Sequence, residues 1–63
     1  MPYTVQFLDA SAAVIAEWSA DAHSARGAIE LTEGARWPSG AVRMRILDAD
    51  GRVVHKRSKE ETP

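Results

Sequence analysis

The chain has 63 residues, no cysteine and a formal net charge of −1. This length predicts one domain, close to the lower size limit for a fold that lacks a metal, a disulfide or a partner. The lack of cysteine excludes disulfides and thiolate metal sites and predicts a cytoplasmic protein. No apolar run approaches the roughly 18 residues of a membrane span, so we expect a protein that is neither exported nor bound to a membrane.

The charges are unevenly distributed along the chain. Residues 1–33 hold one basic side chain and five acidic ones, whereas residues 34–59 hold seven basic side chains and two acidic ones. Two further glutamates follow at positions 60 and 61. We therefore expect a molecule with an acidic region and a basic region.

Two strands are predicted in the N-terminal third of the chain. Residues 3–8 alternate apolar and polar side chains with the period of a half-buried strand. Residues 9–12 (DASA) are rich in turn-formers. Residues 13–18 (AVIAEW) favour a second strand that pairs with the first as a hairpin.

A helix is predicted over residues 20–33. Ser19 or Asp21 would cap it, because a short side-chain oxygen accepts hydrogen bonds from the free amides of the first turn. Gly34 would end it in the left-handed conformation. Gly27 lowers helix propensity and falls on the outer side. The inner face, by its spacing of three and four, consists of Ala22, Ala25, Ile29 and Thr32.

The C-terminal half predicts a loop followed by a second hairpin. Residues 36–40 (RWPSG) form the loop, because Pro38 disfavours helix for itself and for Trp37. Apolar side chains then alternate with arginines over residues 42–46, and DADG (residues 48–51) is a hairpin turn in which Gly51 takes positive φ.

The register of this second hairpin depends on the loop length. With all four residues of the turn in the loop, Ile46 faces Val53 and Met44 faces His55. One face is then apolar, and the other carries four cations, namely Arg43, Arg45, Arg52 and Lys56. A three-residue loop would shift each partner by one position and mix the faces.

The order strand, strand, helix, strand, strand predicts an α+β fold of ββαββ type, a four-stranded antiparallel sheet with one helix packed on one face. Residues 1–57 would form this single domain, and residues 58–63 (SKEETP) a disordered polar tail.

The layout resembles a group of short bacterial proteins of unknown function. The segments that carry the resemblance are PYTVQFLD (residues 2–9) and VRMRILDADGRVV (residues 42–54), and with the order of the elements they cover most of the chain. The resemblance implies a ββαββ fold and a bacterial cytosolic setting, and it implies no activity.

The sequence offers no catalytic, metal or cofactor site. Placing Asp48 and Asp50 in an EF-hand loop puts Ile46 and Arg57 where carboxylates are required. His23 and His55 are the only histidines, and no cysteine completes a zinc set. No nucleophile elbow or phosphate-binding loop is present, and so small a domain has little room for a substrate cleft. We therefore expect a protein without enzymatic activity, small-molecule substrate or cofactor.

Two functions remain. A domain this small buries little apolar surface, so self-association would add stability, and the acidic region of one copy would attract the basic region of another. We expect a non-catalytic protein-interaction module that forms a homodimer or binds another protein, with interface candidates Leu8, Leu31, Leu47 and Val54. The alternative is a nucleic-acid-binding module whose cations contact phosphates while Trp37 stacks on a base; its candidate residues are Arg36, Trp37, Arg43, Arg45, Arg52 and Lys56. The same residues also have a purely structural interpretation. Trp37 would cover one end of the core, and the arginines would be ordinary solvent-exposed side chains of a strand.

Overall fold

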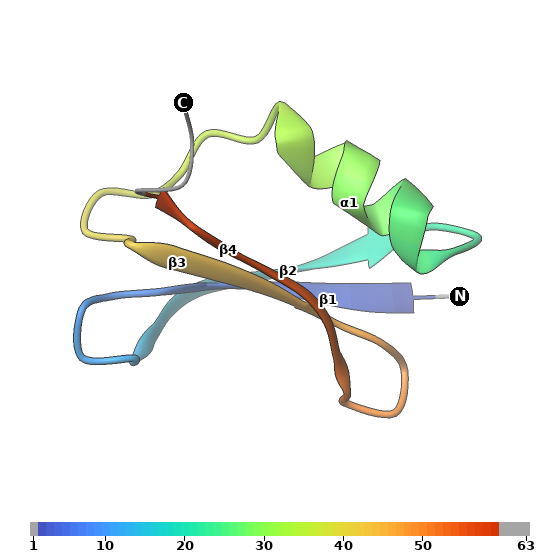
Figure 1. Ribbon diagram of the computed structural model, residues 1–63, viewed down its shortest axis with the longest axis horizontal. Helices are drawn as coiled ribbons and strands as arrows, with labels where there is room; N and C mark the ends of the chain where they lie inside the picture. Colours follow the sequence, from blue (N-terminus) through green and yellow to red (C-terminus); the bar gives the residue numbers. More distant parts are fainter. Residues whose placement is uncertain (1, 60–63) are drawn as a thin grey trace.

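Residues 2–59, which the computed structural model describes, fold as one antiparallel sheet with a helix on one side (Figure 1). The elements are β1 (Pro2–Leu8), β2 (Val14–Asp21), α1 (Ala25–Glu33), β3 (Arg43–Leu47) and β4 (Val53–Ser58). The strand order is β2-β1-β3-β4, so β1 and β3 are central and β2 and β4 are the edges. The predicted α+β fold of ββαββ type is confirmed.

The core lies between α1 and the sheet. Val5 and Phe7 of β1 and Ile46 of β3 are at most 2% exposed, and Ala28 of α1 is fully buried. Met44 is buried with them, as the alternation in β3 predicts. The remaining buried members are small, namely Ala20, Ala22 and Ala41. Small side chains let the helix approach the sheet closely, and they also limit the apolar area that this core removes from water.

The two hairpin turns are built in the same way, although their sequences differ. Asp9 Oδ1 accepts hydrogen bonds from the backbone N–H groups of Ser11 and Ala13 at 2.9 and 3.0 Å. Asp48 Oδ1 accepts from Asp50 and Arg52, both at 2.9 Å. The fourth residue of each turn has positive φ, 68° at Ala12 and 85° at Gly51. Each turn is accompanied by a bulge, between Phe7 and Leu8 in one ladder and between Ile46 and Leu47 in the other.

The second strand is longer and the helix shorter than the sequence predicts. β2 pairs with β1 through Ser19 and Asp21, which were expected to cap the helix. Ser24 caps it instead, where its Oγ accepts a hydrogen bond from Gly27 N at 3.2 Å. The cap candidates were wrong because pairing with the central strand holds residues 19–21 extended, and Ser24 is the next short polar side chain suited to a cap.

Two glycines of the helix differ from expectation. Gly34 is the C-cap, but its φ is −96°, so the predicted left-handed ending is wrong; its N–H bonds to the carbonyl of Thr32. Gly27 is partly buried rather than on the outer side. A Cβ at Gly27 would lie 3.5 Å from the Cβ of Ala22, which is in contact distance, so this position faces the segment before the helix.

The register of the β3–β4 hairpin differs from the four-residue-loop arrangement. Ile46 pairs with His55 and Met44 with Arg57, whereas Leu47 pairs with Val53. The backbone N–H of Asp48 donates to the carbonyl of Arg52 at 2.9 Å, which closes a three-residue loop. This loop alone would shift the partners by one position, and the bulge before Leu47 then shifts them once more. As a result, cations stay together on one face of the hairpin.

The strand β4 extends to Ser58, one residue into the segment expected to form a disordered tail. Lys59 follows, and its backbone N–H donates to the carbonyl of Val42 at 2.9 Å. Residues 60–63 of that predicted tail lie outside the described residues.

Candidate functional site

The face of the sheet opposite α1 is the candidate site, and we call it the open face. Within residues 2–59, no helix packs over it, because α1 contacts β1, β2 and β4 from the other side (Figure 1). Side chains alternate between the two faces of a strand, so the open face takes the neighbours of the core residues. It is formed by Pro2, Thr4, Gln6, Leu8, Val14, Glu17, Ser19, Asp21, Arg43, Arg45, Leu47, Val53, Lys56 and Ser58.

A polar row crosses all four strands of the open face. Gln6 pairs with Glu17 on one side and with Arg45 on the other, and Arg45 pairs with Lys56. Gln6 Nε2 donates to Glu17 Oε2 at 2.6 Å, and Arg45 Nε donates to Gln6 Oε1 at 2.6 Å. We call Glu17, Gln6, Arg45 and Lys56 the polar row. Its charge changes from negative at the β2 edge to positive at β3 and β4.

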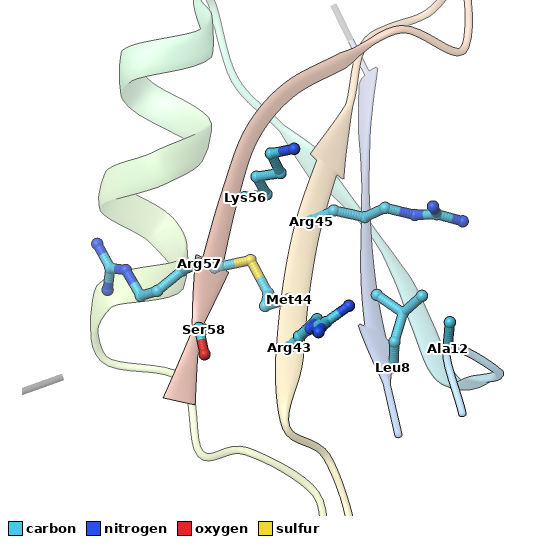
Figure 2. Close-up of a pocket in the computed structure, with 8 residues that line it drawn as sticks. All are labelled: Leu8, Ala12, Arg43, Met44, Arg45, Lys56, Arg57 and Ser58. Carbon is cyan, nitrogen blue, oxygen red and sulfur yellow. The ribbon is translucent and has the colours of Figure 1, made fainter. Parts of the chain in front are cut away.

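The positive half of the open face contains a shallow groove of about 370 Å³. It lies over β3, β4 and the end of β1, beside the β1–β2 turn, and is lined by Leu8, Ala12, Arg43, Met44, Arg45, Lys56, Arg57 and Ser58 (Figure 2). We call this the basic groove, because four of its eight residues are cationic and none is acidic. Figure 2 shows Arg45 extending across β1, whereas the guanidinium of Arg57 points toward α1. The charge that faces the groove therefore comes mainly from Arg43, Arg45 and Lys56.

The structure divides the nucleic-acid candidates into two groups. Arg43, Arg45 and Lys56 lie together in the basic groove. Trp37 is half-buried on the core side, where its ring meets that of Phe7 edge to face, with centroids 5.4 Å apart and an interplanar angle of 66°. That contact makes Trp37 a cover for one end of the core. Arg36 lies beside Trp37, and Arg52 is exposed in the β3–β4 turn, so neither lines the groove.

The four interface candidates are not brought together on one surface. Leu8 and Leu47 both lie on the open face, but Leu8 is only 6% exposed and Leu47 is half-buried. Val54 is 37% exposed at the bulge in the edge strand β4. Leu31 is 52% exposed on α1, over the opposite side of the sheet. The open face therefore offers some aliphatic surface within a mostly polar setting.

Two members of the polar row, Gln6 and Glu17, were not among the sequence candidates. Gln6 carried a usable signal, because it alternates with Val5 and Phe7 and so belongs to the polar face of β1. Glu17 carried no such signal without the β1–β2 register, because the predicted strand at residues 13–18 reads as an apolar segment with a single charge. Counting charges along the chain located the acidic half, but strand pairing places one of its carboxylates, Glu17, in the same row as Arg45 and Lys56.

The two histidines occupy different surroundings. His23 is exposed between β2 and α1. His55 is half-buried on the core side of β4 opposite Ile46, and its Nε2 is buried with no hydrogen-bond partner among the described residues. Within residues 2–59, no three side chains of the His, Cys, Asp and Glu types gather in a way that would hold a metal ion.

Comparison with known proteins adds no assignment to this site. No family model, no curated protein and no solved structure matches the chain. The resemblance to short bacterial proteins therefore stays a prediction. Among residues 2–59, α1 is too short and too polar to cross a bilayer as a helix.

Proposed function

We propose that this protein is a small, non-catalytic protein-interaction module that self-associates as a homodimer through the open face. The observation that carries the proposal is the uncovered face of the sheet, which bears a row of charges running from negative to positive across four strands. A row of this kind attracts a second copy of itself in reversed orientation. No catalytic step is assigned to any residue.

The energetics of the fold support a partner on this face. Val5, Ile46 and Met44 are the largest fully buried side chains, and much of the remaining core is alanine. A chain of this size gains little net stability from such a core, since burial barely exceeds the entropy of ordering the chain. Contact with a second copy would remove further surface from water and stabilise the folded form by mass action.

Sedimentation equilibrium tests the proposal directly. The monomer has a mass of 6.9 kDa. Between about 10 and 500 µM, a range suited to a weak, small interface, we expect the weight-average mass to rise toward twice that value. Raising the salt concentration should favour the monomer, because exposed charges are screened. A monomeric mass at the highest concentration and low salt would contradict the proposal.

Nucleic-acid binding is the second candidate, and the basic groove favours it. Arg43, Arg45 and Lys56 line one concave surface that has no acidic lining residue. Such a surface neutralises phosphates along a backbone, and each contact releases a counterion and adds salt-dependent affinity. Because Trp37 lies on the core side, this candidate relies on charge and not on base stacking.

Fluorescence anisotropy with labelled single-stranded and duplex oligonucleotides tests this second candidate. Binding should weaken steeply between about 50 and 200 mM salt. Arg43→Ala and Lys56→Ala should each lower the affinity and reduce the salt slope by about one. Arg36→Ala is the matched control, since Arg36 is a cation outside the groove. The absence of binding at low salt, or an equal loss in the control variant, would exclude the groove as a nucleic-acid site.

A further inference from the structure

The order of charges in the polar row is such that only one orientation of a two-fold axis brings opposite charges of two copies together. Across the sheet it reads Glu17 on β2, Gln6 on β1, Arg45 on β3 and Lys56 on β4. The row is therefore acidic at one edge, neutral next to it and basic over the other half. Its midpoint lies between the two central strands.

We propose that two copies stack open face to open face about a two-fold axis that runs parallel to the strands, between β1 and β3. This inference rests on the proposed self-association and specifies its geometry. The axis reverses the strand order, so that β2 of one protomer lies over β4 of its partner. Glu17 then meets Lys56 of the partner subunit, and Gln6 meets Arg45 of the partner subunit, each contact occurring twice.

The alternative in-plane axis, perpendicular to the strands, is disfavoured by charge. It would place β2 over β2 and β4 over β4, so that Glu17 faces its own symmetry mate and Lys56 faces its own. Like charges that meet across an interface oppose association. The distribution of charge across the strands thus selects the parallel axis.

The hydrogen bonds within each protomer leave groups available for the partner. Glu17 accepts from Gln6 through Oε2, so its Oε1 retains acceptor capacity. Arg45 donates to Gln6 through Nε, so its two terminal nitrogens retain donors. The Gln6 bonds hold both charged side chains in place before association, which lowers the side-chain entropy that the contact costs.

The rows on either side are compatible with this stacking. Leu47 pairs with Thr4 and Leu8 with Arg43 in the sheet, so the same axis sets Leu47 over Thr4 of the partner subunit and Leu8 over Arg43 of the partner subunit. Facing sheets pack about 10 Å apart, with their strands crossing at about 30°.

The contact would be small and mostly polar. The Cα positions span 29 × 23 × 15 Å, so the larger face covers on the order of 500 Å², below the area of a standard interface. Specific stable interfaces bury about 800 Å² per partner, and smaller ones are typical of transient complexes. The dimer should therefore dissociate in the micromolar range or above.

Charge reversal with mixing tests the arrangement. Glu17→Lys alone and Lys56→Glu alone each create two like-charge contacts, so each should raise the dimer dissociation constant by about tenfold or more. In an equimolar mixture of the two variants, both contacts between positions 17 and 56 of a heterodimer join a lysine to a glutamate. The heterodimer should therefore form about as tightly as the wild-type dimer. The double variant E17K/K56E should also form a homodimer about as tightly as the wild type, because each contact again joins a lysine to a glutamate.

Matched controls and a second pair of variants accompany the test. Glu33→Lys on α1 and Arg36→Glu in the following loop reverse charges away from the open face and should leave the dimer unchanged. Glu17→Gln and Lys56→Gln remove each charge without reversing it, and each should also raise the dimer dissociation constant, by less than the reversal does. If a charge-reversal variant does not fold, these neutral variants still test the arrangement.

The outcomes separate the arrangement from the proposed function. If the wild type is a monomer at every concentration, self-association itself is wrong. If the wild type is a dimer but the single reversals do not weaken it, or the mixture does not form a heterodimer, then the two-fold arrangement is overturned while self-association stands. Weakening in each single variant with recovery in the mixture supports both.

Discussion

Arg45 on β3 donates a hydrogen bond from Nε to Oε1 of Gln6 on β1, at 2.6 Å. This contact joins residues that are 39 positions apart in the chain, and both side chains are half-buried on the open face. Gln6 passes the link on to Glu17 through its Nε2. Two oppositely charged side chains from different hairpins are thus connected through one neutral amide.

A double-mutant cycle measures the strength of that contact. Gln6→Ala, Arg45→Ala and the double variant should give a coupling energy of about 1 kcal/mol, since the donor is charged but the pair is partly solvated. Urea unfolding at a protein concentration below the dimer range supplies the free energies of unfolding. A coupling energy near zero would mean that the bond adds nothing to the fold.

The equivalent positions Ala12 and Gly51 predict opposite effects of substitution. Ala12 has φ of 68°, a conformation that costs an L-residue about 1 kcal/mol and costs glycine nothing. Glycine also makes the unfolded chain more flexible, which offsets part of this gain. Ala12→Gly should therefore raise the free energy of unfolding by about 0.5 kcal/mol.

Gly51→Ala is the matched reverse change. A Cβ at Gly51 meets no atom within 4 Å, so the expected loss of about 1 kcal/mol comes from the backbone alone. Thermal and urea unfolding of the two variants would show the opposite signs. A destabilised Ala12→Gly protein would contradict the turn geometry described for residues 9–13.

Asp9 predicts an acid-dependent part of the stability. A hydrogen bond from the Ser11 hydroxyl, assisted by the backbone N–H groups of Ala13 and Ser11, holds the pKa of the Asp9 carboxyl below its usual value. A carboxyl with a lower pKa in the folded state stabilises the fold above its unfolded pKa, and this contribution is lost as the pH falls through its folded pKa.

An NMR titration of the side-chain carboxyls tests this expectation. The Asp9 pKa should move up toward its ordinary value in the Ser11→Ala variant, because the largest contribution to the shift is then absent. The Asp9→Asn variant has no carboxyl at this position, so its free energy of unfolding should fall less than that of the wild type as the pH is lowered. An Asp9 pKa that is unchanged by Ser11→Ala would assign the shift to the backbone donors instead.

Ile46 and Leu31 separate a core position from a surface one. Ile46 is fully buried, and truncating such a side chain to alanine costs about 2–5 kcal/mol, which is comparable to the whole stability of so small a domain. Ile46→Ala should therefore be largely unfolded at 25 °C. Leu31 is 52% exposed on α1, so Leu31→Ala should stay within about 0.5 kcal/mol of the wild type. Circular dichroism with urea measures both, and an unfolded Leu31→Ala protein would contradict the position of this helix.

The spacing of apolar residues predicted the order of the elements, because this spacing differs between strands and helices. Met44 and Ile46 alternate with arginines, which is enough to assign both the strand and its buried face. The same reasoning failed at Ser19 and Asp21, where good cap residues lie in a strand. Pairing with β1 extends β2 through these positions, and local propensity contains no information about a partner strand.

The site was predicted only in part, because register decides which side chains meet. Arg43, Arg45 and Lys56 were grouped correctly by alternation, but their neighbours were not. The pairing of Arg45 with Lys56 depends on a three-residue loop together with a bulge, and the link to Glu17 depends on the order of four strands. Neither feature is visible in residue spacing within one hairpin.

Site-specific cross-linking tests the central claim most directly, since the chain has no cysteine of its own. Glu17→Cys protein with an isotope label is mixed with unlabelled Lys56→Cys protein and treated with a short bis-maleimide, and Leu31→Cys serves as the control partner. The account predicts cross-linked heterodimer of Glu17→Cys with Lys56→Cys, well above either homodimer and above any product with Leu31→Cys. Preferential cross-linking of Glu17→Cys to itself, or no preference at all, would contradict the stacking of β2 over β4.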